Sequence, residues 1–453
     1  MGCTLPYVHG NVNSLLQDNP ELVSYKDADG NTQRYKRIDY EYDLVSGNVN
    51  KVIYQAEKAD MLIHKYEYDA DNKITNVYTS KDDVIYDEDV TYFYYQHGPL
   101  ARVELGENNV QGIDYAYTLQ GWIKGVNSDA LEENYDIGKD GALNMANTAR
   151  SFSRDAYSYS LGYYQGDYTG IGGSSINFLA NKNAATYLAT DAPNLYNGNI
   201  SSMATSIYNI DPYSPKFGDV LPQLTAYRYD QLNRITQMKA YQDLVNNAWG
   251  SGSTYNGDYE MSLSYDANGN IKTLNRNGYT DNTNAIVNTM DNLTYSYDQT
   301  TTKKTNKLIG IADIANSLYD TDIDDQKING VPFDASNQTT WNYNYDKIGN
   351  LIKDASEGIE NIEWTIYGKV KSITKSDGTS ISYKYDATGN RISKTLGGIM
   401  GGGYTIYYVR DAQGNIMATY RKGTGSIQNP PLTLVDLQLY GSSRYGVLNY
   451  TNC

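Results

Sequence analysis

A short phrase recurs along the chain, and this recurrence constrains the fold more than any single residue does. The phrase is Tyr, any residue, Tyr-Asp, two further residues, Gly-Asn and then an aliphatic residue. One copy runs from Tyr383 to Ile392, and another runs from Tyr343 to Leu351. Repetition of one small unit indicates an array of one supersecondary element, so the first question is what such an array builds.

The second half of the phrase has the composition of a type I β-turn. The Asp carboxylate can accept backbone N–H groups inside such a turn, and a Gly in the fourth position supplies the positive φ that a following bulge needs. Four copies have Asp first and Gly fourth: Asp266 to Gly269, Asp346 to Gly349, Asp386 to Gly389 and Asp411 to Gly414. Two further copies have Asn fourth: Asp69 to Asn72 and Asp230 to Asn233. Because Asn tolerates the left-handed region best after Gly, this exchange favours a conformational role over a chemical one.

The residues on either side of the turn predict strands. Tyr at alternate positions before the turn places two rings on one face of a strand, as at Tyr66 and Tyr68 or at Tyr227 and Tyr229. After the turn, apolar residues recur two and five places beyond the Gly or Asn: Val49/Val52, Ile74/Val77, Leu100/Val103, Ile123/Val126, Ile235/Met238, Ile271/Leu274 and Val370/Ile373. A spacing of three fits one face of a straight strand only if a bulge intervenes, and otherwise both faces are partly covered; a helix would also accept it. The β-branched residues and the preceding turn favour a strand.

Each copy therefore predicts a β-hairpin, and the chain is predicted to be all-β. The copies are centred near these tyrosines: Tyr42, Tyr68, Tyr94, Tyr117, Tyr229, Tyr265, Tyr297, Tyr345, Tyr367, Tyr385 and Tyr408. Some copies are degenerate: Tyr95 and Thr118 replace the Asp, and no Gly follows Asp298. Loss of individual residues without loss of the strand pattern is expected of a scaffold and not of a catalytic motif.

Composition narrows the class of protein further. Hydrophobic residues make up 40% of the 453 residues, but 47 of them are Tyr, which is lean for a thick aliphatic core and suits a thin sheet with at least one wet face. The net charge of −16 argues against nucleic acid as a partner, because that requires a basic surface. No run of about 18 apolar residues occurs, so no membrane span is predicted.

The ends of the chain give little information on compartment. The two cysteines, Cys3 and Cys453, exclude a disulfide framework, and an oxidising compartment is neither required nor forbidden. Residues 1–10 lack the basic and apolar regions of a signal peptide, and Pro6 stands where myristoylation needs a hydroxyl residue. We therefore expect the chain to be a fragment of a longer, secreted or cell-surface protein whose signal lies elsewhere.

The repeat divides the chain into three parts. A first block of hairpins occupies residues 1–127, and a second occupies residues 225–453. Between them, in residues 128–224, the repeat fades. This middle part is predicted to be an elaborated insertion in the same body, with a short helix over Asp140 to Arg154; a separate domain is the alternative.

No set of residues predicts catalysis, a cofactor or a metal. His9, His64 and His97 are isolated, and no nucleophile elbow or phosphate-binding loop occurs. The strongest acidic cluster consists of Asp320, Asp322, Asp324 and Asp325. It resembles the start of a calcium loop, but Asp325 and Val331 occupy the places of the required Gly and Glu, so ion binding stays open. Asp27 to Gly30 is incomplete in the same way.

The phrase resembles the consensus of the RHS/YD-repeat family, most closely at Tyr345-Asp346 with Gly349-Asn350 and at Tyr385-Asp386 with Gly389-Asn390 and Arg391. The resemblance covers both hairpin blocks. It implies a long antiparallel sheet that spirals into a hollow shell, or an arc of one. In bacterial polymorphic toxins and insecticidal toxin complexes the shell encloses a C-terminal toxic domain, and teneurins use a similar barrel in adhesion.

One part of the family pattern is missing from this sequence. Many bacterial members carry a core after the repeats that ends in an Asp-Pro-x-Gly segment with aspartates for self-cleavage. No such segment follows Tyr440 to Gly446, and Asp211-Pro212 lies in the middle insertion, so the cleavage role is not carried onto it. The conserved core and the toxin are expected to belong to the remainder of a longer chain, which would be the principal partner.

Three functions follow from these observations. The first is a structural, non-catalytic shell segment of a secreted or surface protein. The second is an extracellular adhesin or carbohydrate-binding module that uses Tyr-rich surfaces, and tyrosines packed wholly between strands would argue against it. The third is a hydrolase that uses paired aspartates. A β-propeller is the rival fold, but the copies are about 18 to 48 residues apart, which is too irregular for blades of about 40–45 residues.

Overall fold

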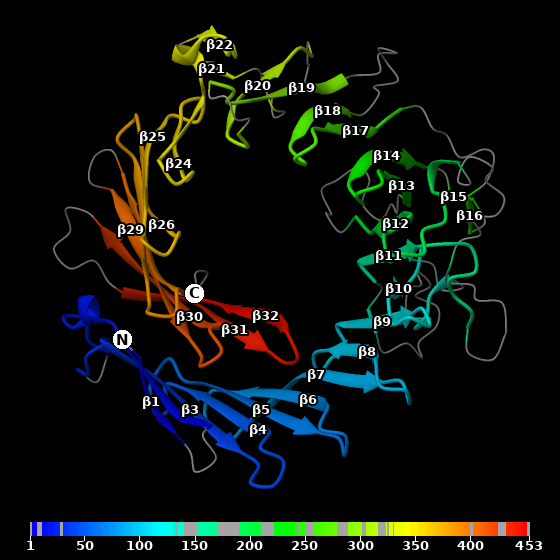
Figure 1. Cartoon of the computed structure of the whole chain (residues 1–453). Coiled ribbons are helices and arrows are strands. Elements are labelled where there is room, and N and C mark those ends of the chain that lie inside the picture. The colour runs from blue at the N-terminus through cyan, green and yellow to red at the C-terminus, as the bar shows by residue number, and fades with distance from the viewer. Residues whose placement is uncertain are drawn as a thin grey trace. The chain divides into compact units, whose positions relative to one another are not determined.

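A computed structural model shows the chain as strands joined by tight turns (Figure 1). The chain forms two compact units: unit 1 comprises Met1–Thr91 and Asn342–Cys453, and unit 2 comprises Tyr92–Trp341. The structure describes all residues except 1, 7–10, 28–29, 130, 132–134, 140–151, 154, 171–178, 180–189, 210–221, 243, 246, 250–256, 279–288, 301–304, 316–322, 324–325, 329, 399–401, 425–431 and 451–453.

Unit 1 contains strands from both ends of the chain. The N-terminal strands are β1 (Gly2–Pro6), β2 (Val12–Asp18), β3 (Tyr35–Tyr42), β4 (Val49–Tyr54), β5 (Leu62–Tyr68), β6 (Ile74–Ser80) and most of β7 (Asp87–Tyr94), with the 3-10 turn η1 (Pro20–Leu22). The C-terminal strands are β23 (Tyr343–Tyr345), β24 (Leu351–Asp354), β25 (Ile359–Trp364), β26 (Val370–Lys375), β27 (Ser380–Tyr385), β28 (Arg391–Gly397), β29 (Gly403–Arg410), β30 (Ile416–Thr424), β31 (Leu432–Tyr440) and β32 (Arg444–Asn449). The latter form one sheet in which sequence neighbours pair antiparallel.

Unit 2 continues the same antiparallel pattern. Its strands are β8 (Leu100–Leu105), β9 (Gln111–Tyr117), β10 (Ile123–Val126), β11 (Tyr157–Gly162), β12 (Ser202–Ile207), β13 (Gln223–Tyr229), β14 (Ile235–Tyr241), β17 (Met261–Tyr265), β18 (Ile271–Asn277), β19 (Thr289–Tyr297) and β20 (Leu308–Asp313). Two small hairpins, β15 (Leu244–Val245) with β16 (Ala248–Trp249) and β21 (Lys327–Ile328) with β22 (Val331–Pro332), stand apart from the main ladder. The 3-10 turn η3 (Gln338–Thr340) follows the second.

A bulge beside the turns of the repeated phrase explains the apolar spacing of three. In the hairpin of β17 and β18, Leu274 pairs with Leu263 and Ile271 pairs with Tyr265, so the register shifts by one at Lys272. Leu263 and Tyr265 are two residues apart, so their side chains lie on the same face of the sheet. Because of the bulge, the side chains of their partners Leu274 and Ile271 lie on that face as well. The same shift occurs in the hairpins that end at Tyr42, Tyr68, Tyr229, Tyr345 and Tyr385. The sequence left a bulge and a two-sided covering open, and the structure has the bulge.

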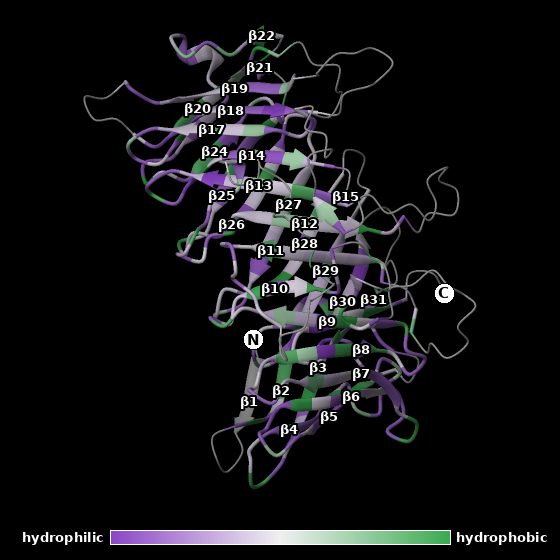
Figure 2. Ribbon diagram, turned by 90° about the vertical axis from the view of Figure 1, so that its right-hand side faces the viewer, coloured by the Kyte–Doolittle hydropathy of each residue, from purple (hydrophilic) through white to green (hydrophobic). Residues whose placement is uncertain are grey.

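The largest core lies in unit 1, where N-terminal and C-terminal strands pack their side chains together. It joins Ile38, Tyr54 and Leu62 to Tyr420 and Leu437, all of them buried. In Figure 2, hydrophobic and hydrophilic colours alternate along single strands, as expected for sheets with one face covered. This packing was not predicted, because residues 38–62 and 407–439 are far apart in the sequence.

Unit 2 has a smaller apolar cluster in the described part of the chain. It gathers Ala204, Leu224, Ala226, Tyr241 and Trp249. Here charged side chains are buried in pairs: Lys124 Nζ lies 2.7 Å from Asp167 Oδ2, with both residues below 9% exposed. Arg102 and Arg276 pair with the buried Asp114 and Asp291.

The prediction of an all-β chain built from antiparallel hairpins is confirmed. Two details differ from the sequence reading. Trp364 ends the strand before the turn at 365–368, whereas Tyr367 lies inside that turn and is 83% exposed. Strand β12 carries no copy of the phrase and was not foreseen.

The predicted helix over Asp140 to Arg154 lies almost entirely outside the described residues, and the hollow shell remains a prediction. No helix in the described residues is long and apolar enough to cross a membrane.

Candidate functional site: the aspartate turns and the tyrosine links

The repeated aspartates fold their own turns. Asp266 Oδ1 accepts the backbone N–H groups of Asn268 and Asn270, both at 2.9 Å, and Asp266 Oδ2 accepts the side-chain N–H of Asn270 at 2.9 Å. Gly269, the fourth residue, has φ = +90° and donates its N–H to the Asp266 carbonyl. The Asn of the phrase therefore closes the turn on the carboxylate.

The same geometry recurs in the other copies. Asp230, Asp346, Asp386 and Asp411 each accept two backbone N–H groups from residues two and four places on. The fourth residue has positive φ throughout: Asn72 and Asn233 at +62° and +61°, and Gly349, Gly389 and Gly414 between +86° and +96°. The predicted conformational role of Gly and Asn is what the structure shows.

The turn hydrogen bonds also set the charge state of the carboxylates. In Asp266 the pKa lies below its usual value, chiefly because the Asn270 side chain donates to the carboxylate. In Asp230 the backbone N–H and the side chain of Arg234 likewise lower the pKa. A carboxylate that is ionised and already holds several donors is poorly suited to general acid–base catalysis, which needs a pKa near the working pH and free reach to a substrate.

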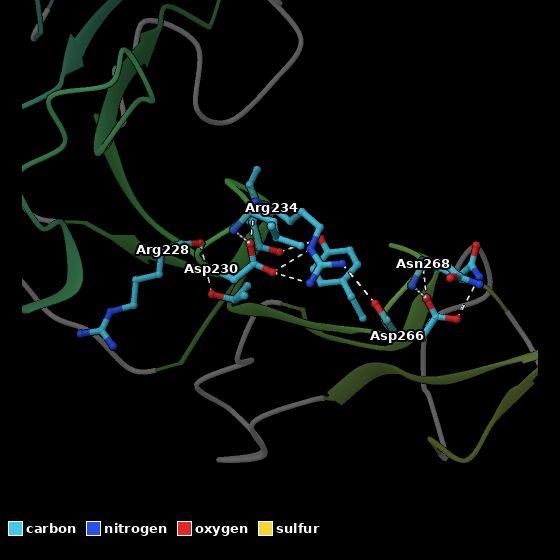
Figure 3. Close-up of polar contacts among 10 residues, drawn as sticks. Arg228, Asp230, Arg234, Asp266 and Asn268 are labelled. Atoms are coloured by element: carbon cyan, nitrogen blue, oxygen red, sulfur yellow. Dashed lines mark hydrogen bonds and ion pairs between the residues drawn. The ribbon is translucent and has the colours of Figure 1, made fainter.

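Neighbouring turns are joined by polar side chains. Arg234 donates from Nε to Asp230 Oδ2 of its own turn at 2.7 Å and from Nη1 to the Asp266 carbonyl of the next turn at 3.2 Å (Figure 3). Its guanidinium lies 4.5 Å from the centre of the Tyr265 ring. Asn268 and Asn270 in turn donate to Asn306, at 3.1 and 2.9 Å. Successive turns are thus fixed side by side.

A second element of the phrase joins successive hairpins. We call it the tyrosine link: a tyrosine at the end of a hairpin's first strand, or just beyond it, donates its hydroxyl to a backbone carbonyl of the preceding strand or of the residues that lead into that strand. The bonds measure 2.7 to 2.9 Å and join Tyr42 to Val12, Tyr68 to Val49, Tyr163 to Ile123, Tyr229 to Ile200, Tyr265 to Ile235, Tyr297 to Ile271 and Tyr385 to Val370. Trp364 makes the equivalent bond from its indole N–H to Leu351, at 2.7 Å.

The ends of the ladders explain why these carbonyls are chosen. The ladder of β18 with β19 ends at Thr273, and the linked carbonyl belongs to Ile271, two residues beyond. The ladders that end at Lys51, Gln237 and Ser372 obey the same rule, with links to Val49, Ile235 and Val370. A strand carbonyl beyond its ladder needs another donor, and the tyrosine hydroxyl supplies it.

The hydroxyls are suited to permanent donation. Burial raises the pKa of Tyr68, Tyr229 and Tyr297, so these hydroxyls keep their protons at neutral and mildly alkaline pH. The link was missed from the sequence, although two signals for it are present: the tyrosine next to the Asp recurs, and the aliphatic residue two places after the turn recurs with it. Their pairing crosses from one repeat to the next, which a reading of single repeats does not reveal.

The residues considered for ion binding form no site in the described part of the chain. Asp320, Asp322, Asp324 and Asp325 lie outside the described residues, as does His9. Asp27 closes a turn by accepting from Asn31, and His97 stacks on Tyr95. Among the described residues no group of three or more His, Cys, Asp or Glu side chains is arranged to hold a metal ion.

Comparisons with known proteins gave structural matches only. No family model matches the chain, and no curated protein matches it. The chain is similar to the crystal structure of TcdB2-TccC3 without its hypervariable C-terminal region, at 11% identity and a TM-score of 0.39, over 98% of this chain and 20% of that one. It is also similar to the crystal structure of TcdB2-TccC3, at 13% identity and a TM-score of 0.29, over 99% and 26%.

A third match is to the Tc holotoxin pore of Photorhabdus luminescens, at 11% identity and a TM-score of 0.28, over 97% and 23%. The chain thus spans about a fifth to a quarter of the proteins it matches. The matched structures are of Tc toxin components, and insecticidal toxin complexes are among the proteins that the motif resembles.

Proposed function

We propose that this chain is a structural, non-catalytic segment of the wall of an encapsulating shell, within a longer secreted or cell-surface protein that encloses or presents a C-terminal toxic domain. The observation that carries the proposal is the tyrosine link. It fastens one hairpin to the next at regular places, so the repeat serves to extend a wall.

The disposition of polar groups supports a wall over an enzyme. The repeated carboxylates are held by turn N–H groups, and the repeated tyrosine hydroxyls are held by strand carbonyls. Groups already committed to the fold cannot also act on a substrate without breaking it. The second candidate, a carbohydrate-binding surface of exposed tyrosine platforms, is disfavoured because the linked tyrosines donate to the backbone and their rings are partly or fully buried.

Small-angle X-ray scattering tests the proposal on the chain as it exists. A filled globule of 453 residues has a radius of gyration of about 22 Å. A curved wall around solvent has a larger radius, and its pair-distance distribution peaks beyond half of the maximum dimension. A radius near 22 Å, or a distribution that peaks at short distances as an elongated solid does, would contradict the proposal.

A further inference from the structure

In unit 1 the N-terminal strands contact the C-terminal sheet through polar groups as well as through the core. We call the contact between residues 17–89 and residues 384–450 the terminal clasp. The side-chain amide of Gln17 hydrogen-bonds to the backbone of β29. Its Nε2 donates to the Tyr408 carbonyl at 2.9 Å, and its Oε1 accepts from the Arg410 N–H at 3.2 Å. Tyr40 accepts the Ala412 N–H at 2.8 Å.

A buried polar cluster lies inside the clasp. Lys36, with no exposed surface, donates to Asp60 at 2.8 Å, and its ammonium lies 4.1 Å from the centre of the Tyr420 ring. Tyr420 donates to the same carboxylate of Asp60, and its hydroxyl lies 2.5 Å from that of Tyr54. These groups satisfy one another's hydrogen bonds inside the closed clasp.

His64 is the exception in this contact. It lies on β5, paired with Val52 and Thr79 on the flanking strands, and has no exposed surface. Neither ring nitrogen makes a hydrogen bond of normal geometry, and the backbone of Gln438 on β31 lies beside the ring, across the clasp. The ring lies parallel to that of Tyr66, with centres 6.4 Å apart. The neutral imidazole ring therefore packs in the interface as an apolar side chain would.

The charged groups around His64 do not offer it a counter-ion. On β6 its neighbour is Thr79. Beyond Thr79, the Asp89 carboxylate on β7 accepts a hydrogen bond from the Tyr445 hydroxyl on β32, at 3.1 Å. On β31 the Gln438 side chain donates to Asp436 and accepts from Arg444, so it bridges these two oppositely charged groups. A proton taken from solvent by His64 would therefore place an unpaired charge inside the closed clasp.

We propose that His64 makes the terminal clasp acid-sensitive, so that protonation of its ring separates the C-terminal sheet from the N-terminal strands while the hairpins within each stay paired. Burial lowers the pKa of His64 to about 4, whereas in the open, hydrated state the ring would titrate near 6.5. The open state therefore binds a proton more readily, and acid favours it between these two values.

The other clasp acids do not produce the same response. For Glu21, burial acts to raise the pKa, but hydrogen bonds from Lys384 and Tyr407 outweigh it and leave the pKa below its usual value, so this contact persists in mild acid. Burial raises the pKa of Asp89, but its carboxyl oxygen can still accept from Tyr445 once protonated. The inference concerns closure of the fold and stands apart from the proposed shell function.

The test is to insert a specific protease site after the exposed Ser336, cut the folded chain, and follow the association of the two pieces by size-exclusion chromatography from pH 7 to pH 5. Linkage with the two pKa values given above predicts association roughly 20-fold weaker at pH 5 than at pH 7. His64→Leu keeps a side chain of similar volume but cannot take up a proton, so its association is expected to weaken by less than about 3-fold between pH 7 and pH 5. Asp89→Asn and, as a matched histidine control, His97→Leu are expected to respond like the parent.

Pieces that stay together equally well at both pH values, or a His64→Leu chain that separates as the parent does, would overturn the proposal. Because the insertion could disturb folding, the uncut chain provides a second measurement. Hydrogen exchange, normalised for the intrinsic effect of pH, is expected to rise selectively at pH 5 in the peptide that covers Arg410 and Ala412, whose N–H groups donate across the clasp, and not in His64→Leu. An increase spread evenly over all strands would contradict a clasp that opens.

Discussion

In unit 1 two sheets share a face of packed side chains, whereas the described part of unit 2 buries fewer large apolar residues and more charged ones. The unit 1 core includes Tyr54, Leu62 and Leu437, while the unit 2 cluster centres on Trp249 and Tyr241. The hairpins, turns and tyrosine links are the same in both. One repeat can therefore build a sheet that is covered by a second sheet in one region and uncovered in another, provided that the uncovered part is stabilised by hydrogen bonds and ion pairs.

The largest expected effect falls on unit 2. Lys124→Met leaves the Asp167 carboxylate buried without its cation, although it still accepts the Tyr163 N–H. Breaking a buried pair in this way costs about 3–5 kcal/mol. Hydrogen exchange resolved by peptide is expected to show the loss in β10 and β11 and not in β29 to β31. Lys371→Met, at the exposed pair with Glu363, is the control and should change stability by less than about 1 kcal/mol.

The next effect falls on unit 1. Leu437→Ala removes a side chain with no exposed surface from the shared face and is expected to cost about 2–5 kcal/mol. Val447→Ala, on the neighbouring strand and 44% exposed, should stay within about 0.5 kcal/mol of the parent in urea unfolding. If both substitutions had the same small effect, the two sheets of unit 1 would not share a core.

Mild acid is expected to lower the free energy of unfolding of unit 1 more than that of unit 2. Because burial lowers the pKa of His64 from its ordinary value of 6.5 to about 4, the contribution of the neutral ring is fully present above pH 6.5 and is lost as the pH falls toward 4. The loss amounts to roughly 3 kcal/mol and belongs to unit 1. Turn carboxylates such as Asp43 in unit 1 and Asp266 in unit 2 also have lowered pKa values, so they weaken the fold only at still lower pH, in both units. Exchange measured at pH 7 and pH 5 distinguishes the two.

The smallest of these effects concerns a single turn, and it should be the same in both units. Gly349→Ala places a side chain at φ = +96° in open space, so its cost is conformational only, about 1–2 kcal/mol. Gly349→Asn is the matched control, because Asn72 and Asn233 hold the same turn position at positive φ. Equal losses for Ala and Asn in thermal unfolding would contradict the conformational reading of the repeat.

Local features of this fold could be predicted from the sequence, because a turn is decided by neighbouring residues. Asp and Gly or Asn at fixed offsets identified the turns, and alternating Tyr identified the strands that lead into them. Contacts between distant segments could not be predicted in the same way. His64 was interpreted as an isolated histidine, and no pattern distinguished Lys36, because their burial depends on strands more than 300 residues away that carry Tyr420 and Gln438.

The tyrosine link lies between these two cases. Both partners belong to the repeated phrase, but they stand in successive copies, and only the point where a ladder ends shows which carbonyl needs a donor. The link recurs in both units, so it is the feature of the repeat on which the two units most depend in common.

The most direct test of this account is therefore the free energy of unfolding of Tyr→Phe chains, measured in urea one residue at a time. Removing the hydroxyl of Tyr68, Tyr229, Tyr265, Tyr297 or Tyr385 is expected to cost about 1 kcal/mol each, with the ring retained. The same change at the exposed Tyr35, Tyr157, Tyr196 and Tyr367 is expected to cost less than about 0.5 kcal/mol. Equal, small losses in the two groups would show that the hydroxyls do not hold the hairpins together.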